Sequence, residues 1–237
     1  MRIDFHSHIL PKMDDGASST DESIEMLKIL AKDNVDRVLL TSHFYRQNEN
    51  IQKFLERRQA SYERLCEAAN GIRGLPELTL GAEVYFYPSL SSDPDFEKLT
   101  IGNTDYILLE LPFERFHDNF YSDFAKFMNR CDNRIVLAHA ERYLSFGNNV
   151  DDIRRICSMG NITCQMNCST IAEAGIFARN QLFKMISEGM ISALGTDAHN
   201  LSVRPPLFKK AEKLIVKKCG SHEFENICLR SEKILSE

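Results

Sequence analysis

Residues 38–43, Val38-Leu39-Leu40-Thr41-Ser42-His43, place a continuous apolar run just before a histidine. The same arrangement returns in Ile107-Leu108-Leu109-Glu110 and in Ile135-Val136-Leu137-Ala138-His139. Branched apolar residues without polar alternation are typical of strands buried on both faces, as in parallel sheets. These three stretches therefore predict parallel strands, each followed by a side chain that can bind a metal or transfer a proton.

Apolar runs alternate with helical patterns along the whole chain, which indicates an α/β fold built from βαβ units. We expect strands near 2–6, 37–41, 78–82, 106–110, 134–138, 162–166 and 191–194, and helices near 51–69, 119–130, 150–159, 178–188, 206–218 and 221–235. An earlier helix follows Ser19-Thr20-Asp21-Glu22, which has the pattern of a capping box. Seven strands can form an open doubly wound sheet or a barrel, and periodicity does not separate the two.

The composition is that of a folded globular protein, with 43% hydrophobic and 27% charged residues. No linker, composition shift or repeat divides the chain, so we expect a single domain over residues 1–237. The formal net charge of -5 leaves no basic excess for nonspecific binding to nucleic acid. Since no apolar run approaches the ~18 residues of a membrane span, we also expect no membrane insertion.

The seven cysteines are scattered, odd in number and without a C-x-x-C pair. We interpret them as reduced thiols and expect a cytoplasmic protein without a secretory leader. Cys164 and Cys168 are metal ligands in principle. The alternation in Ile162-Thr163-Cys164-Gln165-Met166 instead favours a strand with buried thiols.

Histidines and acids recur at the predicted carboxyl ends of the strands, where active sites lie in parallel α/β folds. His6 and His8 are two residues apart on a strand, so both imidazoles point to one face. With one acid in the first loop, the candidate ligands are His6, His8, Asp15, His43, Glu83, Glu110, His139, Asp197 and His199. A lone histidine is usually an ordinary hydrogen-bonded residue, but recurrence at successive strand ends predicts a site. His117 and His222 lack this placement and are expected at the surface.

Imidazole together with carboxylate is a donor set for zinc, manganese or iron rather than for magnesium or calcium. Nine groups exceed the needs of one ion, and carboxylates can bridge. Two or three neighbouring ions are therefore predicted, an arrangement that suits phosphoryl or acyl transfer. Arg142 and Arg204 follow His139 and His199 closely, and their guanidinium groups are predicted to hold a phosphate or a carboxylate.

Several enzyme classes have no support in the sequence. Neither G-x-x-x-x-G-K-[ST] nor G-x-G-x-x-G occurs, which argues against phosphate-loop and Rossmann nucleotide binding. The chain has no G-x-S-x-G elbow. No cysteine is followed by the arginine of the C-x-x-x-x-x-R loop of cysteine-dependent tyrosine phosphatases. Any phosphatase activity must therefore come from metals.

The order of the nine candidate ligands resembles the polymerase and histidinol phosphatase (PHP) superfamily, and the resemblance covers nearly the whole chain. More narrowly, the chain is similar to the bacterial manganese-dependent protein-tyrosine phosphatases of the CpsB and YwqE type. The motifs that carry this similarity are Phe5-His6-Ser7-His8-Ile9-Leu10, Asp14-Asp15-Gly16-Ala17, His139-Ala140-Glu141-Arg142-Tyr143, Gly195-Thr196-Asp197-Ala198-His199-Asn200 and Arg204-Pro205-Pro206. The implied fold is a distorted (β/α)7 barrel with its metal site at the C-terminal ends of the strands.

The resemblance further implies three divalent metal ions, with manganese favoured and iron or zinc as alternatives. The three ligand sets that it implies are His6, His8, Glu83 and Asp197 for one ion, Glu83, Glu110 and His139 for a second, and Asp15, His43 and His199 for a third. Arg142 and Arg204 match the family's phosphate-binding arginines. His199 and a metal-bound water are the candidate general acids.

The implied activity is metal-dependent hydrolysis of phosphotyrosine in proteins. The implied substrate and partner is a bacterial tyrosine kinase that regulates capsule or exopolysaccharide synthesis. An alternative is a small-molecule phosphatase such as histidinol-phosphate phosphatase, which shares the metals but needs a tighter pocket. The full ligand set disfavours an inactive interaction module, and the net charge disfavours a nuclease. The sequence leaves the oligomeric state open.

Aromatic residues follow Glu110 closely enough to line a cleft for an aromatic substrate. Phe120, Phe124 and Phe127 have the helical spacing of a buried face. We therefore assign those three to the core and leave only Phe113 and Phe116 as candidates for a substrate role.

Overall fold

Parallel strands form the centre of the structure, a computed structural model that describes residues 1–236. The strands are β1 (Ile3–Asp4), β2 (Arg37–Leu40), β3 (His43–Phe44), β4 (Glu77–Leu80), β5 (Glu83–Tyr85), β6 (Tyr106–Glu110), β7 (Arg134–Leu137), β8 (Ile162–Asn167) and β9 (Ile191–Gly195). They make a three-stranded sheet of order β1-β2-β4 and a six-stranded sheet of order β3-β5-β6-β7-β8-β9. The strand pairs described in both sheets are parallel. The predicted α/β class with parallel strands is confirmed.

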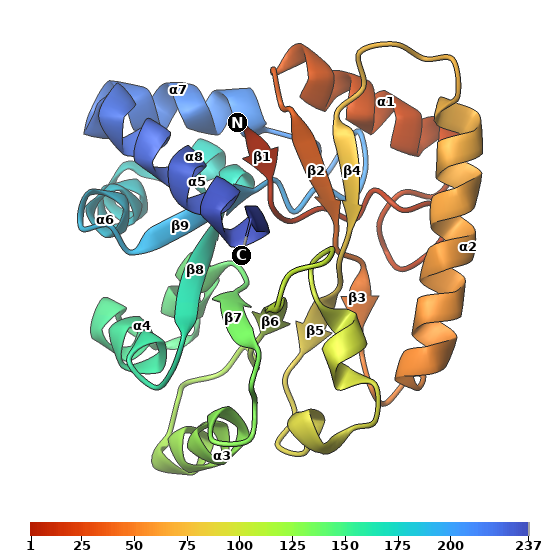
Figure 1. Ribbon diagram of the computed structural model, residues 1–237. Helices are drawn as coiled ribbons and strands as arrows, with labels where there is room; N and C mark the ends of the chain where they lie inside the picture. Colours follow the sequence, from red (N-terminus) through yellow and green to blue (C-terminus); the bar gives the residue numbers. More distant parts are fainter. Residues whose placement is uncertain (237) are drawn as a thin grey trace.

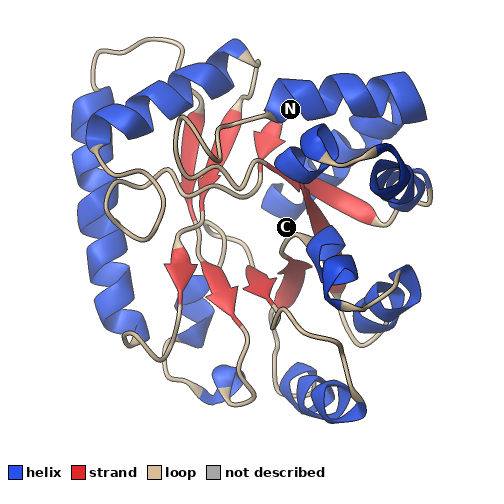
Figure 2. Ribbon diagram, turned by 180° about the vertical axis from the view of Figure 1, so that it is seen from behind, coloured by secondary structure: helices blue, strands red, loops and turns tan. Residues whose placement is uncertain are grey.

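Helices surround the strands, as Figure 1 and the opposite view in Figure 2 show. They are α1 (Thr20–Lys32), α2 (Ile51–Ala69), α3 (Asp118–Met128), α4 (Val150–Cys157), α5 (Cys168–Glu173), α6 (Ile176–Ser187), α7 (Phe208–Cys219) and α8 (Ser221–Ser236). Three 3-10 segments, Leu90–Ser92, Phe96–Leu99 and Ala140–Phe146, lie in the connections. The predicted helices are all present, and the short α5 was missed because six residues give too little periodicity for a prediction.

Two of the predicted strands continue past a break and change partners. After β2 the chain bends at Thr41-Ser42, where Thr41 N donates to Ser7 O at 2.9 Å, and then enters β3. After β4 it bends at Gly81-Ala82 and enters β5. In the second sheet His43 and Glu83 are register partners. The two bends therefore bring two predicted ligands side by side.

A closed barrel is not confirmed, because the hydrogen-bonded strands fall into two sheets. The first and last strands nevertheless lie next to each other. Phe5 N donates to Leu194 O at 2.9 Å, and Ser7 forms a parallel bridge with Ala198. This contact places the ends of β1 and β9 beside each other.

Only half of the predicted capping box at α1 is present. Ser19 Oγ accepts a hydrogen bond from Glu22 N at 3.2 Å, as expected. The prediction is wrong for the reciprocal contact, in which the Glu22 carboxylate would accept from the N–H of Ser19. It accepts instead from the N–H and hydroxyl of Ser18, at 2.8 and 2.7 Å. Helix α2 matches its prediction and is followed by Gly71, whose φ of 82° suits glycine.

The core fills both faces of the strands. A small cluster that includes Phe5, Leu39, Leu108 and Val136 lies on one face, and a larger cluster packs the other face against the helices. Cys164 and Cys168 are fully buried, as predicted, and the seven cysteines described in the chain are free thiols. None of the helices within residues 1–236 combines the length and apolar character that a membrane crossing requires.

Candidate metal centre

The first two predicted ligands follow β1 and project to the same side. Ser7 between them turns away, and its Oγ donates to Leu39 O at 2.7 Å. His6 and His8 are fully buried, and their Nε2 atoms lie 3.1 Å apart. The alternation of an extended chain therefore converges two imidazoles on one point.

Glu83, at the start of β5, lies at the centre of four imidazoles. Its Oε2 is 3.2 Å from Nε2 of both His6 and His8, and 2.8 Å from Nδ1 of His43. Its Oε1 is 2.7 Å from Nε2 of His139. Both oxygens of this carboxylate therefore have histidine neighbours.

The ends of β6 and β9 add two more acids. Asp197 Oδ1 lies 3.7 Å from His6 Nε2 and 3.4 Å from His8 Nε2. Glu110 Oε1 lies 3.4 Å from His139 Nε2. Asp197 therefore lies beside His6 and His8, whereas Glu110 lies beside His139.

A third group lies at the open side of the site. Asp15 Oδ1 is 3.5 Å from His43 Nε2 and 3.4 Å from His199 Nε2, and the Asp15 side chain is 65% exposed. Within residues 1–236, the buried Nε2 of His199 has no hydrogen-bond partner. A nitrogen lone pair without a hydrogen bond, beside a carboxylate and two further histidines, is a donor that fits a metal ion.

The structure brings all nine predicted ligands together, and we call them the carboxyl-end cluster. Three overlapping groups have donor atoms within 4.8 Å of one another: His6, His8 and Glu83; His43, Glu83 and Glu110; and His8, Asp15, His43 and His199. The groups differ from the sets that the resemblance implies: the first lacks Asp197, the second has His43 in place of His139, and the third adds His8. His139 still contacts both acids. His117 and His222 are exposed, in agreement with their prediction.

The histidines and acids of the cluster stabilise one another's charged forms. Burial lowers the pKa of His139, but its hydrogen bonds to Glu110 and Glu83 outweigh burial and raise that pKa to about 9. Burial likewise lowers the pKa of His8, and the charge and hydrogen bond of Asp14 reverse the effect and hold it well above its ordinary value. For Glu83, burial raises the pKa but the neighbouring histidines lower it well below its usual range. Metal ions that bind here must displace protons from histidine.

His199 behaves in the opposite way. Burial, followed by the positive charges of His8 and Arg204, lowers its pKa to about 4. Its imidazole is therefore neutral near pH 7. A neutral imidazole suits a metal ligand better than a proton donor.

Both predicted arginines reach the rim of the cluster. Arg204 Nη2 donates to Asp197 Oδ2 at 2.7 Å, and Arg142 Nη1 lies 3.7 Å from the same oxygen. The guanidinium of Arg142 lies 4.4 Å from the centroid of the Phe113 ring. Each arginine side chain is more than a third exposed, so an anion can reach both.

The aromatic residues divide differently from the prediction. Phe113 is half-buried, with Arg142 over its face and His139 at 5.3 Å between ring centroids. Phe116 is buried in the core, so the prediction that it could line a substrate cleft is wrong. Tyr45 was missed, and its hydroxyl lies 3.3 Å from His43 Nδ1 and 3.4 Å from Glu110 Oε2.

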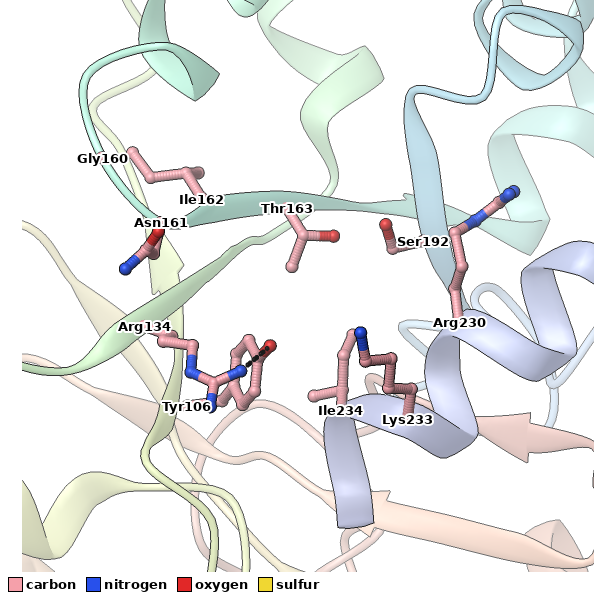
Figure 3. Close-up of a pocket in the computed structure, with 10 residues that line it drawn as sticks. All are labelled: Tyr106, Arg134, Gly160, Asn161, Ile162, Thr163, Ser192, Arg230, Lys233 and Ile234. Carbon is pink, nitrogen blue, oxygen red and sulfur yellow. Dashed lines mark hydrogen bonds between the residues drawn. The ribbon is translucent and has the colours of Figure 1, made fainter. Parts of the chain in front are cut away.

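Two cavities lie near the opposite ends of the strands. The first, of about 580 Å³, opens beside the cluster, and its lining includes Asp15, His43, Tyr45 and Lys53. The second, of about 480 Å³, is shown in Figure 3. We call it the amino-end cavity, and its described lining is Tyr106, Arg134, Gly160, Asn161, Ile162, Thr163, Ser192, Arg230, Lys233 and Ile234. That lining contains none of the nine predicted ligands.

Sequence reasoning also missed buried polar residues that support the ligands. Asp14 Oδ2 lies 2.8 Å from His8 Nδ1 and accepts from His43 N at 2.8 Å. Asp4 accepts from both the N–H and the hydroxyl of Thr196, at 2.7 and 2.6 Å. The doubled acid in Asp14-Asp15 was a usable signal for the first, whereas the contacts of Asp4 with Thr196 join residues far apart in the chain.

Comparisons with known proteins agree along the whole chain. A family model described as "Capsular polysaccharide synthesis, CpsB/CapC" matches residues 2–236. Tyrosine-protein phosphatase CpsB of Streptococcus pneumoniae is 26% identical over 234 residues, which cover 95% of this chain and 94% of the relative. Tyrosine-protein phosphatase YwqE of Bacillus subtilis (strain 168) is 26% identical over 251 residues, which cover 99% and 94%.

The fold is also that of a solved structure. A structure described among those of YwqE from Bacillus subtilis and CpsB from Streptococcus pneumoniae, "unique metal-dependent tyrosine phosphatases", matches with a TM-score of 0.84. The match is 23% identical and covers 99% of this chain and 94% of the other. At this identity the likeness shows the arrangement of helices and strands.

Proposed function

The chain belongs to the CpsB/CapC family, and from that premise we propose that it is a metal-dependent protein-tyrosine phosphatase. The observation that carries the proposal is the carboxyl-end cluster with two arginines at its rim. Histidines and carboxylates supply metal ligands, and the arginines supply bidentate donors for a phosphate. Both arginines contact Asp197, so the phosphate-binding groups lie directly beside the proposed metal ligands.

The proposed site holds three divalent ions, with manganese favoured. The nine residues of the carboxyl-end cluster would hold the ions, and the two oxygens of Glu83 face different histidines among them. The donor set fits these ions, and the Nε2 of His199, which has no hydrogen bond within residues 1–236, supports the fit. When bound, such ions activate water for attack on phosphorus and neutralise charge on the phosphoryl oxygens.

The protein's own groups then hold and orient the substrate. Arg142 and Arg204 bind the outer phosphoryl oxygens, and stacking on Phe113 restrains the plane of the Arg142 guanidinium. Tyr45 lies beside the metal ligands and offers a wall for an aromatic ring. The departing phenolate has a pKa of ~10 in its acid form, so it needs little proton donation. His199, whose Nε2 lies beside Asp15 and His43, is one of the proposed metal ligands.

Two finer points belong to the same proposal. The two sheets form one distorted barrel with the metal site at the carboxyl ends of its strands, and the contact between Phe5 and Leu194 supports this closure. The substrate is a bacterial tyrosine kinase that acts in capsule or exopolysaccharide synthesis, in the cytoplasm. Relatives named CpsB and CapC support the proposed substrate. The free cysteines support the cytoplasmic location.

The test measures phosphate release from a tyrosine-phosphorylated peptide and from histidinol phosphate in parallel. Each substrate is assayed with added manganese and with EDTA. We expect release from the peptide that manganese supports and EDTA abolishes. Preferential release from histidinol phosphate would replace the proposal with a small-molecule phosphatase, and release that persists in EDTA after metal removal would contradict the metal mechanism.

A further inference from the structure

Strand β8 supplies none of the nine proposed ligands, yet it passes directly beside them. Thr163, Gln165 and Asn167 alternate along it and therefore share one face. Gln165 is fully buried and Asn167 is 2% exposed. A buried amide needs hydrogen-bond partners, and both of these find them among the proposed ligands.

Gln165 contacts two histidines from different strands through one oxygen. Its Oε1 lies 3.1 Å from His6 Nδ1 and accepts from His139 N at 2.7 Å. Because a carbonyl oxygen only accepts, His6 must carry its proton on Nδ1. The lone pair of His6 Nε2 is then free to face Glu83 and a metal ion.

The contact with His139 also supports a strained backbone. His139 has a φ of 34°, in the left-handed region that residues with a side chain rarely adopt. The Gln165 Oε1 acceptor satisfies its buried N–H in that conformation. This strained backbone conformation turns the His139 imidazole toward Glu83.

Asn167 extends the contacts to the other side of the site. Gln165 Nε2 donates to Asn167 Oδ1 at 2.9 Å, and Asn167 Nδ2 donates to Asp197 Oδ2 at 2.7 Å. The same Asp197 oxygen accepts from Arg204. Asp197 Oδ1 is thereby left to face His6 and His8.

The packing around these amides leaves no room for another side chain. A Cβ atom on Gly195 would lie 2.4 Å from His6 Cβ and 2.8 Å from Gln165 Nε2. Both distances are well inside van der Waals contact. The glycine at the end of β9 thus allows Gln165 to reach His6.

We propose that Gln165 and Asn167 are positioning residues, which we call the amide relay. Together they orient His6, His139 and Asp197 for metal binding and fix the oxygen that Arg204 holds. The inference rests on the proposed metal-dependent phosphatase function. The two residues touch neither metal nor substrate. They set the geometry of the metal ligands and of the arginine that binds phosphate.

The experiment titrates manganese into metal-free Gln165→Met, Gln165→Glu and wild-type protein, without substrate, by calorimetry. Met has a similar volume but neither the acceptor nor the donor, so we expect manganese affinity to fall by about 10- to 100-fold. Glu keeps the acceptor for His6 and His139 but loses the donor to Asn167, so we expect its affinity to lie between those of Gln165→Met and wild type. Wild-type affinity in Gln165→Met would overturn the proposal.

The matched control is Thr163→Val on the same face of the same strand. Thr163 Oγ1 has no hydrogen-bond partner among the described residues, so the change removes no contact to the site. We expect wild-type manganese affinity. A loss equal to that of Gln165→Met would show that any change in β8 weakens binding and would contradict a specific relay.

Asn167→Leu tests the second residue of the amide relay. It also serves as the main test if Gln165→Met shows no cooperative melting. We expect weaker manganese binding and a several-fold higher KM for a phosphotyrosine peptide, because Asp197 Oδ2 loses its amide donor beside Arg204. Unchanged manganese affinity together with unchanged KM would contradict the role of Asn167. Absence of turnover in the wild type would overturn the phosphatase proposal. The manganese titrations contain no substrate, so they test the amide relay independently of turnover.

Discussion

The two ends of the same parallel strands carry polar sites of different chemistry. At the carboxyl ends, histidines and acids point their donor atoms at common positions, and Glu83 alone contacts four imidazoles. At the amino ends, Arg134 donates to Asp105 and Tyr106, and Arg230 donates twice to Ile191 O. Cavity volumes of about 580 and 480 Å³ do not distinguish the ends. The ends differ in whether metal-binding donor atoms converge on one position, and the chemistry of a site depends on that convergence.

The largest expected effect comes from the centre of the carboxyl-end cluster. Glu83→Gln removes the charge that faces His6, His8, His43 and His139. We expect turnover of a phosphotyrosine peptide to fall by about 100-fold or more, with bound manganese reduced. The control at the opposite end is Ser192→Ala, which should leave turnover unchanged. Equal effects of the two variants would remove the distinction between the ends.

The next effect concerns phosphate binding. Arg204→Ala removes the guanidinium that reaches Asp197 and Asp15, and we expect KM to rise about tenfold with a smaller change in kcat. Arg154 is a matched control, since it is a similarly exposed arginine that pairs with Asp151 and Glu188 on the outer surface. Arg154→Ala should keep the wild-type KM. An unchanged KM in Arg204→Ala would place that residue outside the binding site.

The third effect is a pH dependence of stability without metal. The pKa values of His8, His43 and His139 are raised in the fold, the last to about 9. A raised pKa stabilises the fold fully below the unfolded value of ~6.5, and this stabilisation is lost as the pH rises through the folded value. We therefore expect the Tm of EDTA-treated protein to fall by several degrees between about pH 6.5 and 9.

Manganese should reverse this trend, because neutral histidines bind metal more strongly as the pH rises. Melting curves with and without manganese at matched pH values provide the measurement. A metal-free Tm that rises over this interval would contradict the protonated histidines.

The smallest effect separates the two phenylalanines. Phe113→Leu removes a ring that stacks on Arg142, a contact of about 0.5–1 kcal/mol, so we expect KM to rise about two- to fivefold. Phe116→Leu changes a buried core residue and should lower Tm while it leaves KM unchanged. The reverse pattern would restore Phe116 as the substrate contact.

The carboxyl ends were also the part of the molecule that the sequence predicted well. Apolar runs such as 107–109 and 135–137 fix where strands end, and the next polar residues must then meet at one edge of the sheets. This is why His139 and Glu110 could be placed together without a structure. The breaks after β2 and β4 were not predicted, because a two-residue bend does not interrupt the hydrophobic pattern.

The residues that support the ligands were harder to find. Gln165 appears in the sequence as one polar residue in an alternating strand, and its contact with His6 depends on packing between strands distant in the chain. Tyr45 and Asp4 gain their roles in the same way, from partners that periodicity does not identify. Local pattern predicts which face a side chain takes, whereas its partner there depends on the assembled sheets.

Anomalous diffraction at the manganese edge, from crystals soaked with manganese and phosphate, tests the comparison of the two ends most directly. The account predicts manganese peaks bound by both oxygens of Glu83 and by the surrounding histidines, with phosphate held between Arg142 and Arg204. Manganese absent from the carboxyl-end cluster, or phosphate bound only in the amino-end cavity, would contradict it.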